Sequence, residues 1–128
     1  MTDFRAAVEA RDPDAIAATL AETVVFRSPV AFKPYPGKAL TAAILRGVLR
    51  VFEDFHYVRE LSGDRDHALV FAARIGDVAV EGCDFLHLDD DGLIDEFTVM
   101  VRPLSAAQAL AAAMAAQFDR IQREAATT

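Results

Sequence analysis

Asp84 is the residue whose type and position most strongly suggest chemistry. It lies within an apolar, strand-like run, Glu81-Gly-Cys-Asp-Phe-Leu-His-Leu88, and three more aspartates, Asp89 to Asp91, follow directly. Acidic side chains rarely enter the core of a strand without a partner. Asp84 is therefore a working group, a structural group or a residue on the solvated face of its strand. Asp89 to Asp91 fit a solvated turn, because three adjacent charges repel one another when buried.

Other residues that could do chemistry give little support for a metal or a redox centre. His56, His67 and His87 share no spacing of the His-x-x-x-His kind, so we expect no metal site. Cys83 is the one cysteine of the chain, which excludes an intrachain disulfide and fits a small buried hydrophobic residue on a strand. We expect no cofactor.

Charge and composition narrow the classes of partner. The chain has 13 basic and 20 acidic residues, a net charge of −7, and it offers no positive face for nucleic acid or for a membrane of anionic lipid. The first twelve residues carry five charges and lack the apolar centre of a signal peptide. No uncharged apolar run approaches the roughly 20 residues that span a bilayer. These features predict a cytoplasmic protein.

The first half of the chain reads as helices around one short strand. Asp12-Pro13 is a cap followed by a first-turn proline, and it divides two short helices within the first twenty residues. Residues 23–27 begin with three β-branched residues and predict a strand. Three prolines and a glycine in residues 28–37 indicate a loop. Apolar residues at steps of three and four then predict a long helix over 38–53.

The second half changes to a period of two. Strands are predicted at 54–61, 67–75, 78–88 and 93–101, separated by short segments rich in glycine and aspartate, so that successive strands pair antiparallel. Ser105 is the expected cap of a terminal helix. The 128 residues suit a single domain, 1–128, of the α+β class. The expected architecture is a curved, mostly antiparallel sheet wrapped around helices.

This order of elements resembles the nuclear transport factor 2-like superfamily, in particular its SnoaL-like and ketosteroid-isomerase-like branch. The resemblance covers roughly residues 3–104. It is carried by Phe26-Arg-Ser-Pro29, by Asp84 on the third strand of the meander, by Gly92-Leu-Ile94 and by Val101-Arg-Pro-Leu104. It implies a cone-shaped α+β barrel with an apolar pocket at its open end, and a homodimer packed through the outer faces of the sheets.

The isomerase branch also implies three catalytic positions. The aspartate of its oxyanion hole falls on Asp84, its general base falls on Ser28, and its tyrosine falls on Phe4. A serine needs a base of its own to move a proton near pH 7, and phenylalanine has no donor. The usual isomerase mechanism is therefore not expected. By this resemblance Asp84 faces inward, either as an acid with Ser28 as its hydrogen-bonding partner or as a structural aspartate held by Ser28, Arg27 or the backbone.

The same resemblance predicts the residues around a small apolar or aromatic ligand. Phe32 and Tyr35, from the proline-rich loop, would overhang the mouth of the cavity, and His56 is a further candidate for its wall. The remaining predicted lining residues are Phe4, Ile44, Leu69, Phe71, Phe97 and Val99.

Two hypotheses follow from the sequence. The first is a small-molecule-binding protein of the SnoaL-like type. This hypothesis includes an enzyme of the isomerase, cyclase or hydratase kind with Asp84 in its pocket. The second is a non-catalytic homodimeric interaction or scaffold module with the same fold. They differ in one observable respect, because a scaffold can fill the cone with side chains whereas a binding protein keeps Asp84 open to a cavity.

Overall fold

The computed structural model describes residues 3–127, and it shows four helices and six strands in this part of the chain. The first half forms α1 (Asp3–Glu9), α2 (Pro13–Ala18), β1 (Leu20–Arg27), β2 (Tyr35–Pro36) and α3 (Lys38–Val51). The second half forms β3 (Glu53–Ser62), β4 (Asp66–Ile75), β5 (Val78–Leu88), β6 (Ile94–Arg102) and α4 (Leu104–Ala126). No helix among these residues is long and apolar enough to cross a membrane.

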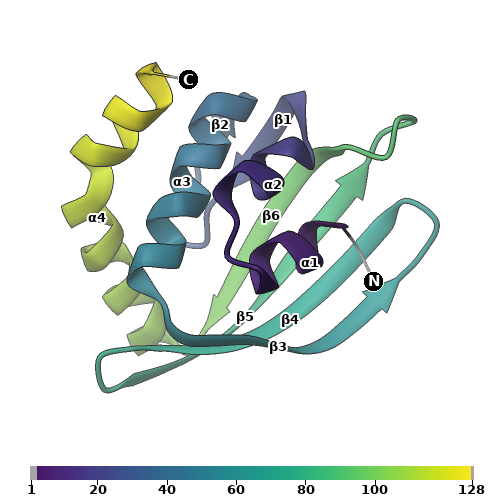
Figure 1. Ribbon diagram of the computed structural model, residues 1–128. Helices are drawn as coiled ribbons and strands as arrows, with labels where there is room; N and C mark the ends of the chain where they lie inside the picture. Colours follow the sequence, from purple (N-terminus) through teal and green to yellow (C-terminus); the bar gives the residue numbers. More distant parts are fainter. Residues whose placement is uncertain (1–2, 128) are drawn as a thin grey trace.

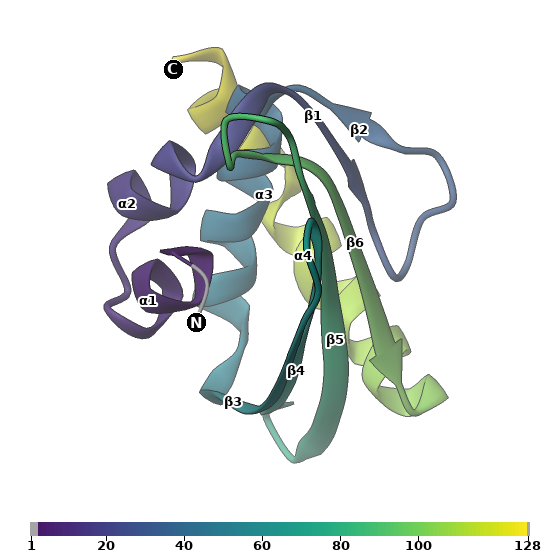
Figure 2. The same ribbon diagram turned by 90° about the vertical axis from the view of Figure 1, so that its right-hand side faces the viewer.

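The six strands form one curved sheet in the order β2-β1-β6-β5-β4-β3. All neighbours are antiparallel except β1 and β6, which run parallel. The sheet curves but does not close, so that the predicted α+β class is confirmed in the form of an open, curved sheet. The helices lie on one side of it (Figures 1 and 2).

Local sequence signals explain where the helices begin. Oδ1 of Asp12 accepts hydrogen bonds from the backbone N–H groups of Asp14 and Ala15, both at 3.1 Å, and caps α2 as predicted. Gly37 precedes α3 with a φ of 97°, a conformation that favours glycine. The predicted cap at Ser105 is wrong, because α4 already begins at Leu104 and Pro103 occupies the capping position without a side-chain hydrogen bond.

The proline-rich segment is more regular than predicted. Tyr35 and Pro36 form the short edge strand β2, which pairs with Phe26 and Val25 of β1. Proline has no backbone N–H, and it is tolerated here because β2 lies at the edge of the sheet. β1 also begins at Leu20, three residues earlier than the β-branched run alone indicates.

The alternation of β5 decides which side chains reach the core. Val80, Gly82, Asp84 and Leu86 are buried on the concave face, beneath the helices. The intervening residues Glu81, Cys83, Phe85 and His87 point to the convex face, which no described element covers. The inward orientation of Asp84 is thus a consequence of strand geometry.

Candidate functional site

Asp84 occupies the middle of the concave face of the sheet. Its neighbours across the strands are Leu69 on β4 and Val99 on β6. The residue is 6% exposed. The hydroxyl of Tyr57, on β3, donates a hydrogen bond to Oδ2 of Asp84 over 3.5 Å. The site therefore consists of a buried carboxyl and a buried phenol from strands that lie two places apart in the sheet.

Apolar side chains surround this pair and leave a cavity of only about 50 Å³, which we call the Asp84 cavity. Asp84 and Tyr57 supply its polar side-chain groups. The other walls come from α1, α2, β1 and the segment after it, α3, β3, β4, β6 and α4. They are Phe4, Val8, Ile16, Phe26, Pro29, Leu45, Val48, Leu49, Phe52, Phe55, Phe71, Val99 and Leu110.

The aromatic rings of β3, β4 and the end of α3 pack together beside the carboxyl. Phe55 meets Tyr57 edge-on, with ring centroids 5.1 Å apart, and lies 4.9 Å from the ring of Phe71. A Cβ atom on Gly82 would collide with the ring of Phe71. Gly82 thus leaves room for the end of the Phe71 ring against β5, two residues from Asp84.

Tyr57 also contacts a cationic side chain from α1. The guanidinium group of Arg5, on α1, lies 5.4 Å from the centroid of the tyrosine ring. The same arginine forms an ion pair with Glu60 at 3.1 Å. A cation over an aromatic face is attracted by the electrons of the ring, so α1 helps to orient Tyr57 toward Asp84.

The surroundings of Asp84 change its ionisation. Burial raises the pKa of the Asp84 carboxyl to about 7, against the opposing effect of the hydrogen bond from Tyr57. None of the ion pairs observed within residues 3–127 involves Asp84. Burial and the neighbouring carboxyl also raise the pKa of Tyr57. Near neutral pH the Tyr57 hydroxyl therefore keeps its proton, and the Asp84 carboxyl is protonated in part of the molecules. In its protonated form the carboxyl, like the hydroxyl, can donate a hydrogen bond.

The predicted site residues fall into four groups. Phe4, Phe71 and Val99 line the cavity with Asp84, whereas Leu69 and Phe97 are fully buried in the core. Three others, Ser28, Tyr35 and Ile44, line a neighbouring groove.

Two residues proposed for the cavity lie elsewhere. Phe32 is fully exposed on its loop. His56 is exposed at the edge strand β3, where its Nδ1 atom lies 2.9 Å from the carbonyl oxygen of Asp54. Alternation explains this placement, because His56 directly precedes the inward-facing Tyr57.

Ser28 has a local partner instead of Asp84. Its hydroxyl oxygen accepts a hydrogen bond from the backbone N–H of Val30 over 3.1 Å, which stabilises the bend after β1. The structure therefore brings Asp84 together with Tyr57 and gives Ser28 a different hydrogen bond. The sequence contained a signal for Tyr57, since it is two residues from Phe55 on a predicted strand and shares its face.

Two further features of the described residues lie apart from Asp84. An open cleft of about 890 Å³ is bordered by α1, α2 and the turn after β5, and includes His67. It is larger than the Asp84 cavity but wide open to solvent. On the convex face, His87, Asp95 and Glu96 have ligand atoms within 4.8 Å of one another and could hold a divalent cation. In the structure Nδ1 of His87 lies 2.7 Å from Oδ1 of Asp95.

Comparison with known proteins places this architecture in a family. The family model described as a SnoaL-like domain matches residues 1–97. A steroid delta-isomerase from Pseudomonas aeruginosa is 40% identical, with a TM-score of 0.88 over 94% of this chain and 89% of that chain. No curated protein shows significant similarity.

Two other solved structures extend the comparison. An uncharacterized protein with a cystatin-like fold from Silicibacter pomeroyi DSS-3 is 36% identical, with a TM-score of 0.86 over 90% of this chain and 82% of that chain. A SnoaL-like protein of unknown function from Burkholderia thailandensis shares the fold at 20% identity, with a TM-score of 0.64 over 79% of this chain and 90% of that chain. The chain therefore belongs to the SnoaL-like family.

Proposed function

We propose that this protein binds a small, mainly apolar molecule through one hydrogen-bond acceptor, which Asp84 and Tyr57 hold together. The observation that carries the proposal is a carboxyl buried among apolar side chains without a cation. A protonated carboxyl and a phenol both donate hydrogen bonds, and an apolar cavity strengthens such bonds to a ligand oxygen. A ketone oxygen is the acceptor that suits this pair. The name of the similar Pseudomonas aeruginosa protein, steroid delta-isomerase, supports a mainly apolar ligand.

The same pair limits the reactions that the site supports. A carboxyl whose pKa is about 7 exists in both forms near neutral pH, and therefore can donate or accept a proton. It is the one acidic or basic group with such a pKa among the described residues that line the cavity. We propose that any chemistry here is a proton transfer carried by Asp84, with Tyr57 stabilising negative charge on the ligand oxygen.

A ligand titration tests the binding site. We expect 2-hexanone to shift the NMR signals of residues around Asp84 at pH 6, and to bind about three- to tenfold more weakly to Asp84→Leu and Tyr57→Phe, because each lacks a donor. Asp119→Leu, an exposed change on α4, is the control. Unchanged affinity in both cavity variants would contradict the proposal. Native mass spectrometry of freshly purified protein would reveal a co-purified molecule.

The convex face of the sheet supports the second candidate function, a homodimeric module. Leu61, Phe85 and Met100 are exposed there, on β3, β5 and β6. They are joined through Ala68, which pairs with Leu61 and Phe85, and through Cys83, which pairs with Met100. We propose that a second copy of the chain covers this patch in a two-fold arrangement, since large exposed apolar patches mark interaction surfaces. The small volume of the Asp84 cavity also favours this candidate.

The oligomeric state tests the second proposal. We expect sedimentation at about twice the monomer mass at micromolar concentration, and a shift to the monomer in Phe85→Glu, which places a charge in the patch. Phe118→Glu is a matched control, because Phe118 is similarly exposed but lies on α4. A wild-type protein that sediments as a monomer would exclude the dimer.

A further inference from the structure

A second apolar hollow adjoins the Asp84 cavity. It has a volume of about 230 Å³ and lies between α3, α4 and the segment that follows β1, and we call it the α3–α4 groove. Its lining is apolar apart from the hydroxyl groups of Ser28 and Tyr35. The lining residues contributed by α4 are Leu110, Ala111, Met114, Ala115, Phe118 and Ile121. The match to the SnoaL-like domain ends at residue 97, before this helix begins.

The groove and the cavity share a wall. Phe26, Pro29, Val48 and Leu110 line both of them. Leu110 is 3% exposed and comes from α4, whereas the other three come from β1, the segment after it and α3. Leu110 is therefore the part of this partition that depends on the position of α4.

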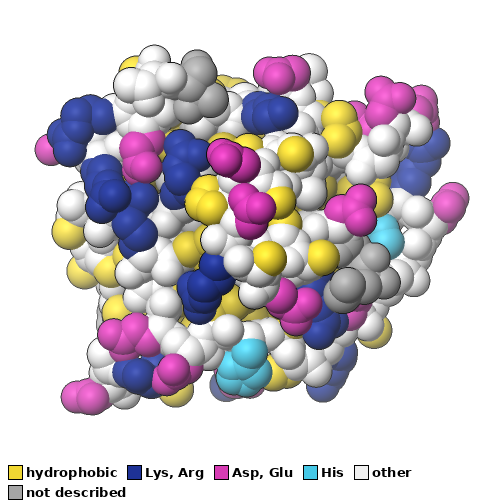
Figure 3. Space-filling model, viewed as in Figure 1, with side chains coloured by type: hydrophobic (Ala, Val, Ile, Leu, Met, Phe, Trp, Pro, Cys, Tyr) yellow, Lys and Arg dark blue, Asp and Glu magenta, His cyan; other side chains and the backbone are white. Residues whose placement is uncertain are grey.

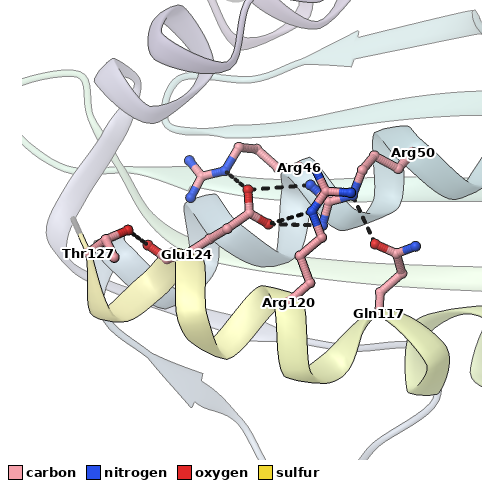
Figure 4. Close-up of polar contacts among 6 residues, drawn as sticks. All are labelled: Arg46, Arg50, Gln117, Arg120, Glu124 and Thr127. Atoms are coloured by element: carbon pink, nitrogen blue, oxygen red, sulfur yellow. Dashed lines mark hydrogen bonds and ion pairs between the residues drawn. The ribbon is translucent and has the colours of Figure 1, made fainter.

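The position of α4 is fixed by its C-terminal half. Arg50 of α3 donates hydrogen bonds to Gln117 over 2.8 Å and to Glu124 over 2.9 Å, and Nε of Arg46 lies 3.4 Å from Glu124 (Figure 4). Basic side chains gather over α3 and α4 at the left of Figure 3. On the buried side, a Cβ atom on Gly47 would lie 2.8 Å from Cδ1 of Ile121, so glycine permits close packing of the two helices.

We propose that the α3–α4 groove is the outer chamber of the ligand site, and that it receives the apolar tail of a narrow ketone whose oxygen lies at Asp84 and Tyr57. Leu110 separates the chambers and α4 limits the length of the tail. This inference rests on the proposed function and extends it to the class of ligand. The occupant is an unbranched or narrow molecule with its carbonyl at one end.

The volumes support this assignment. The Asp84 cavity, at about 50 Å³, accommodates an acetyl group but not a larger ligand. Small-molecule sites occupy roughly 300 Å³ or more, and the cavity and groove together approach that lower limit. The polar groups lie at the inner end and the apolar surface at the outer end, which matches a molecule with a carbonyl head and an apolar tail.

A series of alkan-2-ones tests the two chambers. We expect the affinity of the wild-type protein to rise by about two- to fourfold for each added methylene from 2-butanone to 2-octanone, because each methylene leaves water for the groove. Ala115→Leu fills the groove and should abolish the increase. Ala116→Leu is the matched control, since Ala116 is an exposed neighbour on α4 that does not line the groove, and should retain it.

A second probe examines the partition. Leu110→Ala should strengthen binding of 4-phenyl-2-butanone by about fivefold or more over wild type, because its phenyl ring is too wide to pass a leucine at the junction. If Leu110→Ala does not fold, the comparison of Ala115→Leu with Ala116→Leu still tests the inference. Circular dichroism establishes folding for each variant.

The outcomes separate the inference from the proposed function. Ketone binding that Asp84→Leu weakens, with affinity independent of tail length or equal in Ala115→Leu and Ala116→Leu, overturns the outer chamber and leaves the proposed function intact. If no ketone of the series binds, or if Asp84→Leu binds as well as wild type, the proposed function fails and the inference fails with it.

Discussion

Asp84 in its cavity and Glu124 in the contact between α3 and α4, which we call the seam, are both shielded from water, but their pKa values shift in opposite directions. The seam consists of Glu124 and the arginines Arg46, Arg50 and Arg120. Burial alone would raise the pKa of Glu124, but hydrogen bonds from Arg50 and the charges of Arg50, Arg46 and Arg120 outweigh it and hold the pKa below its usual range. Asp84 has a phenol instead, and burial raises its pKa to about 7. The seam therefore stabilises the ionised form of Glu124, and the cavity stabilises the protonated form of Asp84.

This difference indicates what each region is for. Three arginines converge on Glu124 in a protein whose net charge is negative (Figure 4). The ion pairs from Arg46 and Arg50 join α3 to α4, and Arg120 lies on α4 itself. Such pairing is a structural use of a carboxyl. A buried carboxyl without a cation destabilises the folded state whenever it ionises. An uncompensated group of this kind is a marker of a functional site.

The largest expected effect concerns pH. Because the pKa of Asp84 is about 7 in the folded state and about 4 in the unfolded chain, its contribution to stability is complete below about pH 4 and is lost as the pH rises through 7. The loss is on the order of 4 kcal/mol. In Asp84→Asn, which resembles the protonated acid, this loss should disappear. Urea unfolding of both proteins at pH 5 and pH 9 should record about 3 kcal/mol of this loss, because the remainder has already occurred between pH 4 and pH 5.

The same measurement has a built-in control. Asp119→Asn, on the exposed side of α4, should follow the wild-type pH dependence because it removes an exposed charge. A pH dependence of Asp84→Asn that matches wild type would mean that Asp84 is ionised at neutral pH, and the contrast with Glu124 would disappear.

A smaller effect is expected at the seam. Glu124→Gln leaves three arginines without their carboxylate and should lower the free energy of unfolding by about 1–2 kcal/mol at pH 7. Because the pKa of Glu124 is lowered by folding, its contribution is present above the unfolded pKa and is lost as the pH falls through the folded pKa. The difference between wild type and variant, measured by urea unfolding, should therefore shrink in acid.

Glu22→Gln provides the comparison for that variant. Glu22 is exposed and lies 4.0 Å from Lys38 in a single ion pair, so its substitution should change stability far less. Equal effects of the two substitutions would show that the arginines do not act together on Glu124.

The smallest effect on stability, but the most direct one on the site, is expected from Tyr57→Phe. The loss of one buried hydrogen bond should reduce the free energy of unfolding by about 1 kcal/mol. The hydrogen bond from Tyr57 lowers the pKa of Asp84, so that its removal should raise that pKa further. Carbon-13 NMR titration of the aspartate carboxyls measures the change, and an unaltered midpoint would show that the 3.5 Å contact does not persist in solution.

The sequence predicted the strands and helices that carry the site better than it predicted which residues form the site. The family resemblance placed Asp84 inward, and the burial pattern of β5 agrees, because a strand buried on one face repeats every two residues. The helix at 38–53 was recognisable from its apolar face, and the structure has it at Lys38–Val51. These features depend on local periodicity.

The contact between Tyr57 and Asp84 joins two strands that are distant in sequence, and it was not predictable from local periodicity. Tyr57 reaches Asp84 across β4, 27 positions away in sequence, and no local pattern records that distance. The family pattern instead pointed to Ser28, whose hydroxyl bonds within its own bend. His56 illustrates the same limit, since a change of one residue reverses the face on which a side chain lies.

Gly82 has a consequence for how this site could change. The ring of Phe71 fills the space that any side chain at position 82 would occupy. A smaller residue at position 71 would therefore release room directly beside the carboxyl, while β5 and its pairing stay as they are. One substitution at position 71 would therefore enlarge the Asp84 cavity beside its polar groups. Variants that bind larger ligands can therefore arise without a change in the backbone of β5.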